Sequence, residues 1–219
     1  MAEVVLMCDP RVAAIPVREC GERLVDARYS RLLLDHSRQD PEGAFAHVRE
    51  GVIGRLLAAQ AGLPDGVRLL MVEGYRPPDL QEQYFGQYAQ ELRDANPQWS
   101  SDQVRRAASR YVAPPEIAPH TAGAAVDITL ADADGRELDL GTSTNATPEE
   151  SKGACYMAAK NIGAKARYHR RILASALTGA GLVNYPTEWW HWSYGDRYWA
   201  LMTRSPTAPY GPTTLPSTP

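Results

Sequence analysis

The chain has 219 residues, of which 44% are hydrophobic and 22% charged, with 23 Lys and Arg against 26 Asp and Glu for a formal net charge of −3. This length and composition suit one compact domain with a sizeable core, and the lack of a basic run argues against nucleic-acid binding. No apolar segment approaches the length of a membrane span, and the N-terminus lacks the basic start and long apolar run of a signal peptide. We therefore expect a cytoplasmic protein that binds neither nucleic acid nor membrane.

The three cysteines, Cys8, Cys20 and Cys155, are odd in number and show no C-x-x-C spacing. This pattern argues against a disulfide framework and against a thiolate zinc site.

The first half of the chain predicts three helices and one strand. Residues 51–61 have the pattern of a helix that ends before a glycine, and residues 67–73 form a short apolar strand. Residues 79–95 predict a second helix. A further helix begins at the capping-box pattern of residues 100–103, and the proline pair at 114–115 ends it.

The second half predicts a buried strand and then a long helix. Residues 124–130 have the pattern of a buried strand. Thr147 as N-cap, Pro148 at the first helical position and Glu150 three residues after the cap predict a helix start. We expect the chain to stay largely helical from there to Ala176.

These elements indicate an α+β fold, with helices packed against a mostly antiparallel central sheet. We expect a single domain over residues 1–204. Residues 205–219 are dense in proline, threonine and serine, so we expect an extended or mobile tail.

Two short segments hold the residues that suggest chemistry. The first contains His120 and ends in the predicted strand with Asp127. Because alternate residues of a strand share a face, Asp127 points away from the side of Val126 and Ile128. An aspartate in such a strand is costly to bury unless a metal or hydrogen bonds compensate its charge.

The second segment is Glu188-Trp189-Trp190-His191, within an aromatic-rich stretch that predicts a strand over residues 187–194. On a regular strand Glu188 and His191 lie on opposite faces. They approach one metal only if the strand twists, bulges or ends there, whereas on a helix this i, i+3 pair shares a face. Both geometries stay open at this point.

Together the two segments supply the residues of a catalytic zinc site. A hydrolytic zinc needs three nitrogen or oxygen ligands, an open position for water and a separate carboxylate that moves protons. His120, Asp127 and His191 are the expected ligands of one Zn²⁺ per chain, and Glu188 is the expected base. The same donors also suit other divalent ions.

The chain resembles the zinc D-alanyl-D-alanine dipeptidases of the vancomycin-resistance type, within the wider group of zinc D,D-peptidases. Their pattern S-x-H-x-x-G-x-A-x-D is matched by residues 118–127 except at its serine, and their E-W-W-H by residues 188–191. Residues 26–29 and 73–77 look like two further family segments, in family order. The resemblance spans about residues 26–199 and implies a zinc D,D-peptidase/Hedgehog-like fold.

The resemblance also implies roles for residues outside the metal site. Arg76 would stabilise the tetrahedral intermediate, and Tyr29 would line the substrate pocket. Asn145 stands where the family has an aspartate that holds the free amino terminus of the dipeptide, and Ala118 replaces the serine of the first pattern. The implied reaction is hydrolysis of D-alanyl-D-alanine or a related small peptide.

Two other functions stay open. Ala118 and Asn145 modestly favour a zinc D,D-carboxypeptidase or amidase acting on a larger or N-blocked peptide, because an amide loses charge pairing with an ammonium group. A non-catalytic zinc-binding relative is the third possibility. Glu188 and Arg76 argue against it, since a structural zinc needs neither. The sequence does not specify the oligomeric state.

Overall fold

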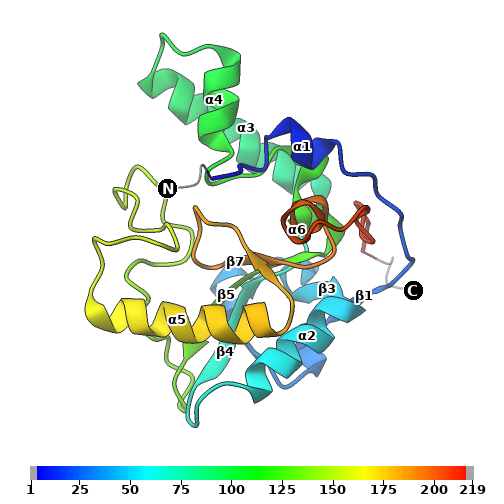
Figure 1. Cartoon of the computed structure of the whole chain (residues 1–219), viewed down its shortest axis with the longest axis vertical. Coiled ribbons are helices and arrows are strands. Elements are labelled where there is room, and N and C mark those ends of the chain that lie inside the picture. Colours follow the sequence, from blue (N-terminus) through cyan, green and yellow to red (C-terminus); the bar gives the residue numbers. More distant parts are fainter. Residues whose placement is uncertain (1–3, 216–219) are drawn as a thin grey trace.

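A five-stranded sheet forms the centre of the protein. The computed structural model in Figure 1 describes residues 4–215. The strand order is β2-β4-β5-β7-β6; only the β2–β4 pair is parallel. The strands are β2 (Leu33–Leu34), β4 (Arg68–Glu73), β5 (Ala125–Ala131), β7 (His191–Ser193) and β6 (Val183–Asn184), beside a ribbon of β1 (Leu24–Asp26) and β3 (His47–Arg49). The predicted α+β fold with a mostly antiparallel sheet is confirmed.

Helices α2 (Glu50–Ala61) and α5 (Ala164–Gly179) pack against each other and against the sheet. A hairpin of α3 (Pro78–Ala95) and α4 (Ser101–Ala108) projects from the body at the top of Figure 1. The short helices are α1 (Pro10–Ala13) and α6 (Arg197–Thr203), with 3₁₀ turns η1 (Ala27–Tyr29), η2 (His36–Arg38), η3 (Ala44–Ala46), η4 (Pro115–Ile117) and η5 (Pro119–Ala122). Within residues 4–215, no helix is long and apolar enough to cross a membrane.

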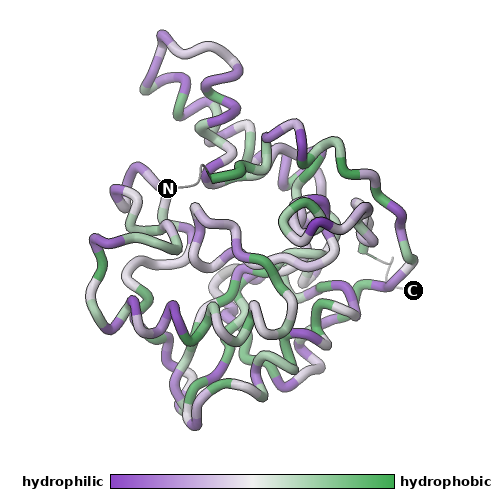
Figure 2. The backbone as a smooth tube through the Cα atoms, viewed as in Figure 1, coloured by the Kyte–Doolittle hydropathy of each residue, from purple (hydrophilic) through white to green (hydrophobic). Residues whose placement is uncertain are grey.

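The core lies between β5 and the helix pair α2 and α5. Val126, Ile128 and Leu130 are fully buried in one cluster with Leu56 of α2 and Leu173 of α5. In Figure 2 hydrophobic segments follow the central strands, whereas the tip of the α3–α4 hairpin is largely hydrophilic. Alternate side chains of a strand point to opposite faces. The apolar residues of β5 therefore pack against the two helices.

The prediction of a helix that starts at Thr147 is wrong. The capping box forms, since the Glu150 backbone N–H donates to Thr147 Oγ1 at 3.1 Å and the Thr147 N–H to Glu150 Oε2 at 3.3 Å. Only one turn follows, because Lys152 and Gly153 adopt left-handed φ angles of 51° and 74°, which a right-handed helix cannot include. The helix begins instead at Ala164.

Arg170 of α5 holds this irregular segment in place. Its guanidinium donates to the carbonyl oxygens of Leu140, Tyr156 and Ala154 at 2.7, 2.7 and 2.8 Å. Burial lowers the pKa of Arg170 to about 10. Arg170 is only 3% exposed. Water therefore has little access to these carbonyls and cannot easily replace the guanidinium as their donor.

We expect Arg170→Met to lower the free energy of unfolding by about 3 kcal/mol, because buried carbonyls lose their charged donor. Urea denaturation measures this loss. The matched control is Arg171→Met, at the exposed neighbouring position of the same helix, for which the change should stay within about 0.5 kcal/mol. Equal losses in the two variants would contradict this role of Arg170.

The tail, as far as residue 215, lies against the body of the protein. Ala208 exchanges backbone hydrogen bonds with Pro16 and Arg18 at 3.0 and 2.9 Å. Tyr210 is 3% exposed, and the Thr213 N–H donates to the Thr121 carbonyl at 3.0 Å. These buried side chains give the segment fixed contacts that proline and threonine content alone does not indicate. The prediction for residues 216–219 lies outside the described residues.

Candidate active site

The register of the sheet brings three polar residues side by side. Glu73 at the end of β4 is opposite Asp127 of β5, after a register shift, and Asp127 is opposite His191 at the start of β7. Directly opposite residues of neighbouring strands project from the same face. For Asp127 this is the face away from Val126 and Ile128, as predicted from the alternation.

His120 reaches the same place from the 3₁₀ turn η5, which precedes β5. Its Nδ1 lies 2.6 Å from the carbonyl oxygen of Gly74. A proton on Nδ1 therefore makes this hydrogen bond and leaves the lone pair of Nε2 directed toward Asp127 and His191. A neighbouring carbonyl thus selects the tautomer that suits a metal ligand.

Gly123 ends the turn that carries His120 and has a left-handed φ of 61°. A Cβ at this position would lie 2.2 Å from Leu24 Cδ2. We expect Gly123→Ala to destabilise the protein by about 2 kcal/mol or more, from backbone strain plus steric overlap. Gly66→Ala is the matched control, since Gly66 also has a positive φ, of 76°, but open space around it. Thermal unfolding of both variants separates the cost of backbone strain from the cost of steric overlap. Equal losses of stability in the two variants would rule out a contribution from overlap.

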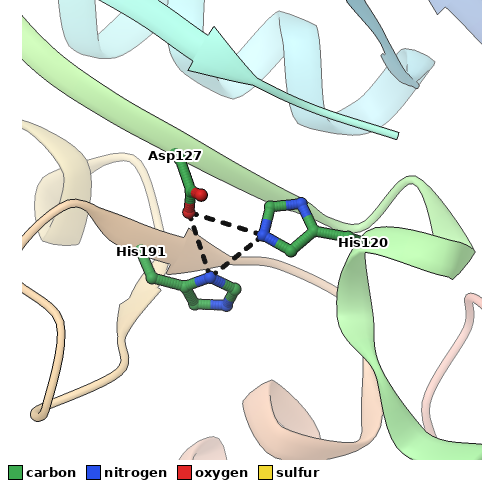
Figure 3. A group of neighbouring side chains, drawn as sticks. All are labelled: His120, Asp127 and His191. Atoms are coloured by element: carbon green, nitrogen blue, oxygen red, sulfur yellow. Dashed lines mark hydrogen bonds and ion pairs between the residues drawn. The ribbon is translucent and has the colours of Figure 1, made fainter. Parts of the chain in front are cut away.

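Three donor atoms form a tight triangle, drawn in Figure 3. His120 Nε2 lies 3.2 Å from His191 Nδ1 and 3.4 Å from Asp127 Oδ1, and the latter two atoms are 3.2 Å apart. Zinc bonds of about 2.0–2.1 Å at tetrahedral angles place two ligand atoms about 3.3 Å apart. The triangle therefore fits a tetrahedral zinc ion without rearrangement.

The protonation of this triangle also suits a cation. Burial lowers the pKa of His191, which favours the neutral ring with a free lone pair. Burial alone would raise the pKa of Asp127, but His120 and His191 outweigh it and hold that pKa well below its ordinary value. All three side chains are buried. The site thus offers the imidazole of His191 with a free lone pair and the ionised carboxylate of Asp127, beside the Nε2 atom of His120.

Glu188 lies beside the triangle rather than in it. The predicted strand over residues 187–194 is wrong in its first part, because β7 begins only at His191 and Glu188 sits in the preceding turn. The turn places Glu188 Oε2 3.9 Å from His191 Nδ1. Burial, with the negative charge of Asp127, raises the pKa of Glu188 well above its ordinary value. A carboxyl group of raised pKa is a stronger base than an exposed one.

Arg76 lines a cavity together with the three donor residues and Glu188, and two neighbours hold its side chain. Its Nε and Nη2 donate to the two carboxylate oxygens of Glu73 at 2.6 and 2.7 Å, and Nη1 donates to Gln81 Oε1 at 2.8 Å. A guanidinium has five N–H donors, so two remain for another partner. The predicted residue is thus fixed in orientation and still able to donate.

Glu73 and Gln81 are the positioning residues that sequence reasoning missed. Gln81 is 1% exposed, and its Nε2 donates to the Ala113 carbonyl at 2.8 Å, which fixes its amide orientation. Glu73 carried a usable signal, because it precedes Arg76 by three residues within the matched segment. Gln81 carried none, since its role depends on the packing of α3 against the segment after α4.

A cavity of about 390 Å³ opens above the triangle. Asn145 lines it, together with Arg76, Glu188 and the three donor residues. Tyr29 does not: it is 91% exposed and is absent from the residues that line this cavity. Of the predicted site residues, the structure therefore brings together all except Tyr29.

The sequence matches the family model described as D-Ala-D-Ala dipeptidase over residues 26–206. It is 29% identical to a D-alanyl-D-alanine dipeptidase of Synechocystis sp. over 216 residues, covering 85% of this chain and 87% of the relative. A D-alanyl-D-alanine dipeptidase of Escherichia coli K12 is 33% identical over 72 residues, which are 33% of this chain and 35% of that protein.

Among solved structures, the LD-carboxypeptidase LdcB aligns over 87% of this chain and 76% of its own, at 18% identity and a TM-score of 0.47. The family model covers most of this chain, including every residue of the triangle, Glu188 and Arg76. The chain therefore belongs to the D-Ala-D-Ala dipeptidase family of metallopeptidases.

Proposed function

We propose that this protein is a zinc-dependent dipeptidase that hydrolyses D-alanyl-D-alanine or a related small peptide. One observation carries the proposal: three buried donor atoms at zinc-ligand spacing lie at one cavity with the carboxylate of Glu188 and the guanidinium of Arg76. Membership of a dipeptidase family supports the substrate class.

His120 Nε2, His191 Nδ1 and Asp127 Oδ1 would hold one zinc ion per chain. A zinc ion bound there supplies a Lewis acid that polarises a carbonyl group and makes a water molecule more acidic. The Gly74 carbonyl keeps His120 in the required tautomer.

Glu188 would accept the proton of the attacking water and later deliver it to the leaving amine. Its position favours this role, because its carboxylate lies next to the donor triangle and lines the cavity. The two remaining N–H donors of Arg76 would stabilise the negative charge that develops on the carbonyl oxygen. Glu73 keeps the guanidinium in place throughout.

Asn145 bears on the choice between this function and a second candidate. Its buried Nδ2 has no hydrogen-bond partner among the described residues, and the side chain lines the cavity. A free amide donor matches a carbonyl oxygen better than an ammonium group. This observation favours, as the alternative, a zinc D,D-carboxypeptidase or amidase acting on an N-blocked peptide.

We propose a cytoplasmic location because Cys8, Cys20 and Cys155 are all free thiols, as is usual in a reducing compartment.

Hydrolysis of a panel of dipeptides tests the proposed function. The zinc-loaded protein is incubated with D-Ala-D-Ala, L-Ala-L-Ala, the mixed isomers and their N-acetylated forms, and the released amine is measured. We expect free D-Ala-D-Ala to be cleaved fastest. Equal rates for the N-acetylated peptides would reject a strict dipeptidase in favour of the second candidate.

A further inference from the structure

The cavity has two walls that come from distant parts of the chain. The α3–α4 hairpin contributes Tyr84, Tyr88 and Glu91, whereas the opposite wall contributes Asn145 and Glu150. This second wall belongs to the connection between β5 and α5. Residues 132–163 of that connection are all described and contain no helix or strand. Backbone hydrogen bonds hold both ends of this connection, from the Leu138 N–H to the Leu130 carbonyl and from the Trp189 N–H to the Cys155 carbonyl. The part around Asn145 is held by side-chain contacts.

Hydrogen bonds join the two walls, and three of them involve Glu149 and Asn145. Tyr88 Oη donates to Glu149 Oε2 at 2.5 Å, and Arg110 Nη2 donates to the other carboxylate oxygen of Glu149. Tyr111 Oη donates to the Asn145 carbonyl at 2.9 Å. Hydrogen bonds to an ionised carboxylate are about twice as strong as neutral ones. Glu149 is thus the strongest link between the hairpin and the opposite wall.

The contacts also reach Asn145 itself. Its φ of 64° lies in the left-handed region, which asparagine tolerates better than other non-glycine residues. Tyr111, just after α4, binds the backbone of this residue, and Glu149 binds Tyr88 of α3 and Arg110 just after α4.

We propose that Glu149 is a positioning residue that clamps the Asn145 wall to the α3–α4 hairpin and thereby sets the affinity of the cavity for substrate. Glu149 acts through the wall and not on substrate, because among the described residues it is not one that lines the cavity. Its two oxygens accept from Tyr88 and Arg110. The identity of the substrate in this inference rests on the proposed function. The contact between Glu149 and the hairpin does not depend on it.

Release of the clamp has a specific kinetic signature. A wall that is loose in the free protein must be ordered when substrate binds, and this cost weakens binding. The donor triangle, Glu188 and Arg76 lie on other segments and keep their geometry. Loss of Glu149 should therefore raise KM and leave kcat nearly unchanged.

The test uses Glu149→Ala in the zinc-loaded full chain, with D-Ala-D-Ala as substrate. We expect KM to rise about tenfold, corresponding to about 1.4 kcal/mol, with kcat within about twofold. Tyr88→Phe removes one of the two donors and should give a smaller rise in KM. The matched control is Glu116→Ala, because the Arg105–Glu116 pair is also an exposed ion pair that involves the hairpin but joins no two walls of the cavity. This control should leave KM and kcat unchanged.

Hydrogen–deuterium exchange of residues 141–155 provides a readout independent of activity. Exchange should increase in Glu149→Ala and stay at the wild-type level in Glu116→Ala. Unchanged exchange in Glu149→Ala, or a fall in kcat at constant KM, would overturn the clamp. If wild-type protein cleaves no dipeptide, the proposed function fails, while the exchange measurement still decides whether Glu149 holds the wall.

Discussion

Glu188→Gln is expected to lower kcat by about 10²–10⁴-fold, the usual contribution of a positioned general acid or base. Glutamine has nearly the same size and fits the same buried position, but it cannot take the proton of the attacking water. Zinc content should remain at one ion per chain, because Glu188 Oε2 lies 3.9 Å from the nearest donor atom of His191, outside the triangle.

Steady-state kinetics and elemental analysis of the same preparation measure both quantities. Glu50→Gln is a suitable control, since Glu50 is an exposed carboxylate at the start of α2. Retention of more than half of the wild-type turnover would remove Glu188 from the role of base. Loss of zinc from the variant would instead make it a ligand.

Arg76→Lys is expected to reduce turnover by about 10²–10³-fold, because lysine replaces a planar fork of donors by a point charge. Lysine keeps a positive charge beside the buried carboxylate of Glu73, whereas Arg76→Ala would leave that charge unpaired, at a cost to stability of about 3–5 kcal/mol. The lysine variant therefore separates the catalytic loss from a folding defect. Zinc content should stay at the wild-type level.

Glu73→Gln provides the comparison for this experiment. It removes the ionised partner of Arg76 but leaves all five donors of the guanidinium, so turnover should fall less than in Arg76→Lys. A lysine variant with wild-type turnover would exclude Arg76 from transition-state stabilisation. Thermal unfolding of both variants checks that they remain folded.

The sequence could indicate the residues of the candidate active site because their signals are local. The spacing of His120 and Asp127 lies within one turn and one strand, and the alternation of β5 determines which face Asp127 occupies. Family membership, the α+β fold and the assignment as a metallopeptidase are confirmed. Each of these inferences depended on motifs or on periodicity within a single element.

Other features depend on contacts that the local sequence does not encode. The Thr147 capping box forms, yet the helix does not continue, because Lys152 and Gly153 adopt left-handed φ angles. Arg170 of α5 binds carbonyls of the segment that follows. The start of β7 at His191, rather than at residue 187, places Glu188 in a turn beside the donor triangle. Tyr29 lies in a matched segment but at the surface. In each case tertiary packing outweighs local preference.

Stoichiometric zinc addition tests the central claim most directly. Metal-free protein is titrated with zinc while release of free D-alanine from D-Ala-D-Ala is followed. The predicted result is an activity that rises in proportion to zinc, levels off at one equivalent per chain and is absent in the His120→Ala variant. Release of no D-alanine at any zinc concentration, or an equal rate in the presence of a chelator, would contradict the account.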